Sequence, residues 1–127
     1  LATWLLGINS PEQVARDPLF GGLFENMVVI EALKQRFNTG ETAELYFMRD
    51  SQGLEADLLF RKNNQTLIPV EIKGGMTWNK DFCKNLLKFR KLSEKFQPGF
   101  VIYSGDLTPE IDGIRFLNFK DTGTAVK

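Results

Sequence analysis

A chain of 127 residues is long enough for one domain with a single sizeable core and too short for two independent ones. Hydrophobic residues make up 43% and charged residues 25% of it, and no apolar run approaches the ~20 residues that span a bilayer, so neither a membrane-spanning nor a disordered chain is expected. Sixteen basic and sixteen acidic side chains leave no formal net charge, so any attraction to nucleic acid depends on where the cations lie.

The chain contains no histidine and a single cysteine, Cys83. Without histidine, Ser-His and Cys-His mechanisms are excluded and the commonest zinc ligand is missing, so chemistry would rest on carboxylates, lysine and a hard metal ion. A lone cysteine excludes an internal disulfide and favours a reducing, cytoplasmic compartment. The start at Leu1 shows no signal-peptide pattern, and we interpret residues 1–19 as a lead-in from a longer protein.

The first elements in chain order are a short apolar turn or helix within the lead-in, a loop, and an amphipathic helix at residues 22–37. The apolar residues of this helix recur at helical spacing, and Asn38 and Gly40 supply its stop. Three segments that favour strand follow, at residues 44–49, 54–61 and 66–73. Short polar turns join them, which predicts an antiparallel meander.

A second helix is predicted at residues 79–96, because Phe82, Leu86 and Phe89 share one side of it and Pro98 follows. Two more strands are predicted at residues 100–104 and 114–119, and residues 120–127 are expected to form a frayed tail. The order helix, three strands, helix, two strands predicts an α/β domain over residues 20–119, with a mixed sheet and a helix on each side.

Charged side chains occur at regular places in the second and third predicted strands. Alternation separates Asp57 from the apolar residues beside it, and it separates Glu71 and Lys73 from Val70 and Ile72. If these strands are neighbours, the charged groups share a face on which paired positions lie ~5 Å apart. Two close carboxylates raise each other's pKa unless a cation lies between them, which favours a divalent metal. A neighbouring lysine would stabilise charge on a water or a phosphate.

Glu25 is a candidate third carboxylate. It lies on the first helix, where the residues three, four and seven positions later are Val28, Val29 and Ala32. An acid on such an apolar stripe is expected to have a partner, since burying a lone carboxylate costs several kcal/mol.

Three stretches carry a resemblance to a known family: "GGLFENMVVIEAL", "YFMRDSQGLEADLLF" and "VEIKGG". An acid on the first helix, an aspartate on the second strand and E-I-K on the third resemble the PD-(D/E)XK nuclease superfamily. Asp57 would be its D, and residues 71–73 its (D/E)XK. The text is more specifically similar to the nuclease-like domain at the C-terminus of prokaryotic AAA+ type ATPases, over roughly residues 20–104.

The resemblance implies a restriction-endonuclease-like α-β-β-β-α-β core and Mg²⁺- or Mn²⁺-dependent hydrolysis of nucleic acid, with DNA the expected substrate. Asp57 and Glu71 would be the metal ligands, Lys73 would orient the water or stabilise charge, and Glu25 would complete the catalytic site. It also implies an ATPase module in the same full-length chain. The sequence departs from the short motif at Ala56, where a proline would precede the aspartate.

Less specific interpretations stay open. Glu71 and Lys73 are also compatible with a solvent-facing strand pair, and the whole domain with a non-catalytic module that docks an ATPase onto nucleic acid or protein. Lysines recur every three or four residues along the second helix, and they are candidates for binding phosphates: Lys84, Lys88 and Lys91. A solvated face is the simpler explanation of these lysines, since no aromatic residue interleaves them. Trp78 is interpreted as a packing residue.

Overall fold

The computed structural model describes residues 3–8, 23–38, 44–50, 55–63 and 65–126. The strands are β1 (Thr3–Ile8), β2 (Leu45–Asp50), β3 (Glu55–Asn63), β4 (Thr66–Ile72), β5 (Phe100–Tyr103), β6 (Glu110–Ile111) and β7 (Ile114–Asn118). The helices are α2 (Leu23–Asn38), α3 (Lys84–Leu92) and α4 (Thr122–Ala125), with short 3-10 helices at Lys80–Cys83 and Phe119–Asp121. None of these helices is long and apolar enough to cross a membrane.

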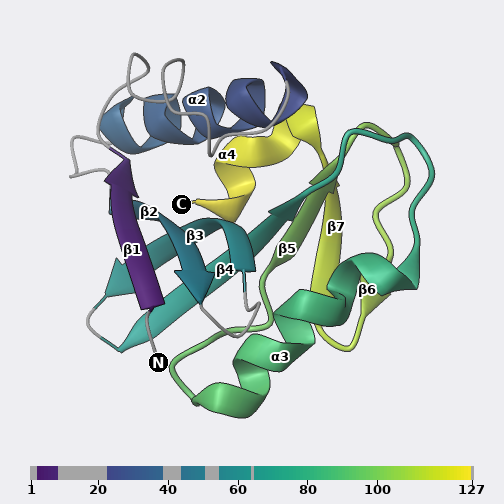
Figure 1. Cartoon of the computed structure of the whole chain (residues 1–127). Helices are drawn as coiled ribbons and strands as arrows, with labels where there is room; N and C mark the ends of the chain where they lie inside the picture. The colour runs from purple at the N-terminus through teal and green to yellow at the C-terminus, as the bar shows by residue number, and fades with distance from the viewer. Residues whose placement is uncertain (1–2, 9–22, 39–43, 51–54, 64, 127) are drawn as a thin grey trace.

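The described strands form one seven-stranded sheet in the order β1-β2-β3-β4-β5-β7-β6. From β1 to β4 each strand runs antiparallel to the next, whereas β4, β5 and β7 run parallel to one another. Figure 1 shows α2 and α4 on one side of this sheet and α3 on the other. The mixed α/β architecture, the antiparallel meander and a helix on each side are therefore confirmed.

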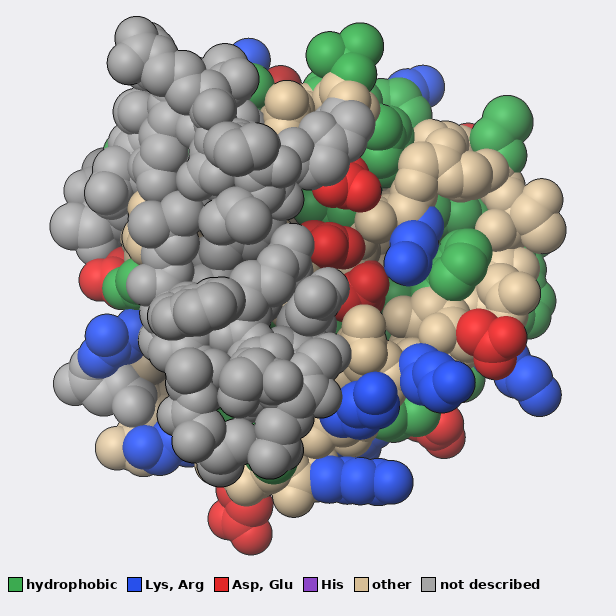
Figure 2. Space-filling model, in the orientation of Figure 1, with side chains coloured by type: hydrophobic (Ala, Val, Ile, Leu, Met, Phe, Trp, Pro, Cys, Tyr) green, Lys and Arg blue, Asp and Glu red, His purple; other side chains and the backbone are tan. Residues whose placement is uncertain are grey.

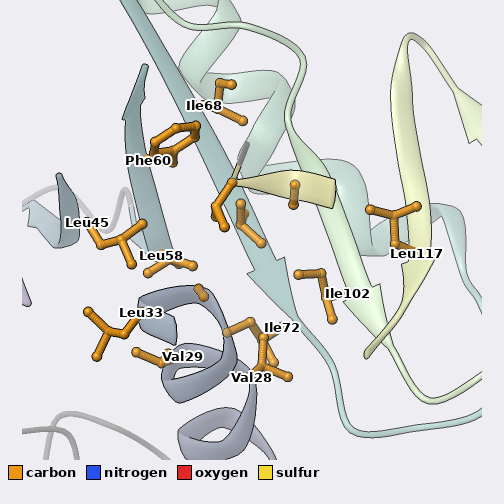
Figure 3. Packing of buried hydrophobic residues seen from close by; sticks show 14 residues of the cluster. Val28, Val29, Leu33, Leu45, Leu58, Phe60, Ile68, Ile72, Ile102 and Leu117 are labelled. Carbon is orange, nitrogen blue, oxygen red and sulfur yellow. The ribbon is translucent and has the colours of Figure 1, made fainter. Parts of the chain in front are cut away.

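The side of the sheet under α2 and α4 is closed by a continuous apolar cluster (Figure 3). Helix α2 contributes residues at helical spacing, among them Val28, Val29 and Leu33, to this cluster. They pack against alternate residues of the central strands: Leu58, Phe60, Ile68, Val70, Ile72 and Ile102. At ~25 cal/mol per Å² of buried apolar surface, this cluster supplies a large share of the folding free energy.

The opposite side of the sheet is covered by α3 and the 3-10 turn before it. Cys83 and Leu86 pack against Val101 and Phe116, and Phe89 packs against the meander. The turn is capped by Asn79, whose Oδ1 accepts a hydrogen bond from the Asp81 N–H at 2.8 Å. The α-helix ends at Leu92, before the predicted end at residue 96, because Ser93 has an extended backbone.

The prediction of a turn or helix in the first part of the lead-in was wrong. Residues Thr3–Ile8 form β1, which pairs antiparallel with β2 along its whole length. Strand pairing satisfies backbone groups that the edge of β2 would otherwise expose, and this partner lies about forty residues away in sequence. The rest of the lead-in, the stop at Gly40 and the connection between β2 and β3 lie outside the described residues.

The prediction of a frayed C-terminal tail was also wrong. Asn118 caps the 3-10 turn after β7, because its Oδ1 accepts a hydrogen bond from the Lys120 N–H at 3.0 Å, and α4 follows. Val126 is fully buried. Its carbonyl oxygen accepts a hydrogen bond from Arg36 of α2, whose guanidinium lies 4.7 Å from the centroid of the Phe60 ring. Ala125 and Val126 are therefore part of the core.

Candidate active site

The alternation predicted for the third meander strand is confirmed. Val70 and Ile72 of β4 belong to the apolar cluster under α2. Glu71 and Lys73 face the side of α3, where Asn85 hydrogen-bonds the Glu71 carboxyl group and the Lys73 ammonium lies 5.7 Å from the centroid of the Phe82 ring. Residues 70–73 therefore anchor the core on one side of the sheet and carry charge on the other.

The pairing of β3 with β4 ends at Leu58 and Val70. The acidic residues Asp57 and Glu71 lie directly beyond this last aligned pair. On the other side of β3, two steps along β2 correspond to three along β3, which is a β-bulge. The bulge brings Ala56 to the α3 side with Leu59 and Phe89, whereas strict alternation along the strand would put it on the face of Leu58.

Asp57 lies in this bulge, at the point where the two strands part. Its Oδ2 accepts a hydrogen bond from the Ile72 N–H at 2.9 Å, which replaces the strand bond missing there. Its carboxyl group also lies within hydrogen-bonding range of Glu71. The sequence-based expectation that Asp57 and Glu71 come together is therefore met, through a bulge that alternation alone does not include.

The Glu71 carboxyl group is almost completely buried. Burial and, next, the negative charge of Asp57 raise its pKa from an ordinary 4.5 to about 8, while Lys73 and the hydrogen bond from Asn85 act in the opposite direction. The pair therefore favours either one shared proton or a cation. Figure 2 shows acidic side chains gathered beside a basic one near the middle of this face.

Lys73 is the exposed member of this group. Its Nζ lies 3.8 Å from Oε2 of Glu71, and its side chain is 42% exposed, whereas that of Glu71 is 6% exposed. Its backbone N–H donates to the Ile102 carbonyl at 2.9 Å, which fixes the end of β4 against β5. The ammonium can therefore reach a molecule in solvent while its backbone stays held by the sheet.

Glu25 lies half-buried in the first turn of α2. The neighbouring Phe24 packs against the chain just after β4, with ring atoms 3.8 Å from where a Cβ on Gly74 would stand. Among the described residues, no three His, Cys, Asp or Glu side chains are grouped so that they could hold a metal ion. The structure thus groups Asp57 with Glu71, but it does not add Glu25 to them as a third ligand.

The predicted lysines lie exposed along α3, on the face opposite its buried Leu86 and Phe89. We call Lys84, Lys88 and Lys91 the lysine stripe. Asn85 is three positions before Lys88 and four before Phe89, so it lies at the boundary between the stripe and the buried face. The residue that hydrogen-bonds Glu71 therefore lies on the same helix as the stripe, next to Lys84.

Sequence reasoning missed the part played by Asn85. The available signal is a polar, poor helix former next to the apolar side of an amphipathic helix, where such residues usually bind a buried partner. Its partner Glu71 comes from a distant strand, so the pairing is visible only in the fold.

Fold and site together define a mixed α/β domain in which a buried glutamate, a half-buried aspartate and a half-exposed lysine meet at the end of the central strand. A model of the family described as Domain of unknown function (DUF4143) matches residues 20–121, and the chain belongs to this family. A search of curated proteins and a search of solved structures each found no match.

Proposed function

We propose that this domain hydrolyses phosphodiester bonds in nucleic acid, with DNA the expected substrate. The observation that carries the proposal is the contact between the Asp57 and Glu71 carboxyl groups next to Lys73, whose side chain is partly open to solvent. Two carboxylates in contact, one of them buried, are unfavourable without a compensating cation, so this site is suited to binding a metal ion, and the accessible lysine beside it is suited to meeting a phosphate.

The two carboxyl groups fit a magnesium or manganese ion. Mg²⁺ commonly takes one or two carboxylates and fills its remaining positions with waters and phosphate oxygens, so a third protein ligand is not required. When bound, the ion would supply a Lewis acid that polarises the phosphate and lowers the pKa of a water. Asp57 and Glu71 would hold it, and the hydrogen bond from Asn85 would orient Glu71.

Lys73 would act on the substrate directly. Its ammonium stands on the solvent side of Glu71, so it can meet a phosphate oxygen or the attacking water. The lysine stripe would hold the flanking phosphates, because it lies on the same helix as Asn85, which hydrogen-bonds Glu71. Glu25 keeps its predicted catalytic role as a proposal that rests on the packing of its neighbour Phe24 against Gly74.

The second candidate is a non-catalytic interaction domain with the same fold. The Ile72 N–H bond to Asp57 and the ion pair of Glu71 with Lys73 favour it, because both acids already have structural partners within the chain. In this case the domain would dock an ATPase onto nucleic acid or onto another protein.

We also propose that an ATPase module belongs to the same full-length chain. Domains of the matched family are typically found in AAA-type ATPase proteins. Either candidate function would then be regulated by the nucleotide cycle of that module.

The first experiment measures Mn²⁺ binding by calorimetry and cleavage of DNA and RNA substrates. Lys73→Met should keep the Mn²⁺ affinity and the melting temperature, because neither the ligands nor the core change, and should slow cleavage roughly 10²–10³-fold. Glu71→Gln should lose the metal first. The matched control is Lys62→Met, an exposed lysine on β3 outside the site, which should cleave normally.

Absence of both Mn²⁺ binding and cleavage in the wild-type protein, alone and joined to an ATPase module, would contradict the hydrolase. A Lys73→Met variant that changes only thermal stability would do the same. Nucleic-acid or protein binding that persists in that situation would favour the interaction domain.

A further inference from the structure

Two loops beside the carboxylate pair expose large apolar side chains. One loop follows β4 and carries Met76 and Trp78, which are 76% and 39% exposed, and the other follows β5 and carries Leu107, which is 65% exposed. We call these three residues the apolar platform. Figure 1 shows the two loops side by side, and Figure 2 shows hydrophobic side chains exposed over them, next to the acidic group.

The two loops are held together by backbone contacts. The Ser104 N–H donates to the Gly75 carbonyl at 3.0 Å, and its hydroxyl donates to the Gly74 carbonyl at 3.1 Å. A Cβ on Gly105 would stand 2.4 Å from the Met76 carbonyl oxygen, so only glycine allows this approach. Asn118 in turn donates to the Gly105 carbonyl at 2.8 Å. The apolar platform is therefore prearranged, and binding would cost little ordering entropy.

Trp78 is anchored by one edge. Its ring centroid lies 6.1 Å from that of Phe116, with an angle of 71° between the rings, and the residue keeps 39% of its surface exposed. Phe116 also contacts Phe82, at 6.4 Å between centroids, and the Lys73 ammonium lies over Phe82. The exposed indole and the proposed catalytic lysine are thus fixed on one aromatic cluster.

Lysines lie beside the apolar platform on the side of α3, together with the exposed acid Asp81. Lys80 follows Trp78 by two positions, is exposed, and continues into the lysine stripe through Lys84. Proteins that bind single-stranded nucleic acid combine such a cationic track with aromatic side chains on which unpaired bases stack. A duplex offers its phosphates to the same lysines, but its bases are already stacked on one another.

We propose that the apolar platform stacks unpaired bases, so that the domain prefers single-stranded nucleic acid or a junction with an unpaired segment beside the cleaved phosphate. The preference for unpaired bases rests on Trp78 and its neighbours, and the position of cleavage rests on the proposed function of Lys73. The run of exposed lysines from Lys80 into the lysine stripe favours nucleic acid over an apolar protein partner as the occupant of this surface.

The test uses the fluorescence of Trp78 in the absence of cleavage. Trp4 is the other tryptophan of the chain, so a Trp4→Phe variant leaves Trp78 as the only indole. Oligonucleotides are titrated in EDTA. Single-stranded DNA or RNA should quench Trp78, and a blunt duplex of the same length should bind without quenching it.

Affinity measurements on variants complete the test. Trp78→Ala should weaken single-strand binding roughly tenfold and leave duplex binding almost unchanged, whereas Trp78→Phe should restore most of the loss, because phenylalanine also stacks. The matched control is Leu92→Ala, which removes a side chain that is 61% exposed at the far end of α3. This control should bind both substrates like the wild type.

The outcomes separate this inference from the proposed function. Metal-dependent cleavage with no effect of Trp78→Ala on affinity or strand preference would overturn the apolar platform and leave the hydrolase standing. Quenching by single strands without any cleavage would support the apolar platform within an interaction domain. Equal quenching by duplex and single strand would overturn the preference, as would concentration-dependent self-association with no oligonucleotide binding.

Discussion

The two sides of the central sheet differ in what the same strands bury: one side buries apolar residues and the other buries a carboxyl group. Under α2 and α4, the alternate residues of β4 join an apolar cluster in which Val70 and Ile72 are buried. Under α3, the intervening residue of the same strand is Glu71, which is equally buried but carries a carboxyl group. Burial of the apolar residues stabilises the fold, whereas burial of the Glu71 carboxyl group destabilises it, because water solvates that group better than the protein interior does.

Glu71 is therefore a position at which a buried residue is not the one that would give the most stable fold. A hydrophobic residue in place of Glu71 would pack against α3 without the cost of desolvating a carboxyl group. Its environment instead includes a second acid, an amide and a lysine, from Asp57, Asn85 and Lys73. Unfavourable electrostatics concentrated in one place are typical of functional sites.

Of the substitutions proposed, one in the apolar cluster should change the free energy of unfolding most. Leu33→Ala removes a fully buried side chain of α2 and should lower the free energy of unfolding by about 2–5 kcal/mol, measured by urea denaturation. The control is Leu23→Ala on the same helix, where the side chain is 87% exposed and the change should stay within about 0.5 kcal/mol. Equal losses in both variants would show that the cluster does not carry the stability.

The buried carboxyl group on the α3 side should make the free energy of unfolding depend on pH. The pKa of Glu71 is raised from 4.5 to about 8, so between these values the folded state holds a proton that the unfolded state has lost. The free energy of unfolding of the metal-free protein should therefore fall as pH rises from 5 to above 8, on the order of 4 kcal/mol at most. The stabilising contribution is complete below pH 4.5 and is lost through pH 8.

Substitution of Glu71 sharpens this prediction. Glu71→Gln should flatten the pH dependence and make the metal-free protein more stable than the wild type at pH 8.5, because the amide stays neutral. Added Mg²⁺ should raise the melting temperature of the wild type there and leave that of the variant unchanged. Glu31→Gln, at an exposed acid paired with Lys34, should keep the wild-type slope. A wild-type profile without any slope would contradict the burial of a perturbed carboxyl group.

The smallest effect on stability is expected on the outer face of α3. Changing all three residues of the lysine stripe to glutamine should alter the free energy of unfolding by less than about 0.5 kcal/mol. Nucleic-acid binding, followed by fluorescence anisotropy, should weaken, and the slope of log affinity against log salt should become shallower by up to about three. An equally charged control changes the exposed lysines Lys34, Lys62 and Lys120 to glutamine. Equal effects in both triple variants would make the lysine stripe an ordinary solvated surface.

Local patterns were sufficient to predict most of the central fold. The helical spacing of Val28 and Leu33 and the two-residue period of Val70 and Ile72 reflect contacts that each element makes along its own length, and α2 and β4 form as predicted. The strand β1 and the helix α4 were missed because a distant partner holds each of them. A stretch as short as residues 122–125 has no periodicity from which burial could be predicted.

The candidate site was predicted in its members but not in its geometry. The spacing of Glu71 and Lys73 placed them correctly on one side of their strand. The β3 bulge inserts one residue, moves Ala56 to the α3 side, and lets Asp57 bind the backbone of β4. Bulges depend on pairing with neighbouring strands, so a single strand's sequence does not reveal them.

The position of β4 between an antiparallel and a parallel neighbour also sets an order of events during synthesis. The meander can close by local hairpins, whereas pairing of β4 with β5 must wait for the crossover through α3. Until residues 84–92 have been synthesised, Glu71 has neither the hydrogen bond from Asn85 nor the covering helix that buries its carboxyl group. The unfavourable burial of the Glu71 carboxyl group, which raises its pKa, is therefore expected only when α3 packs onto the sheet.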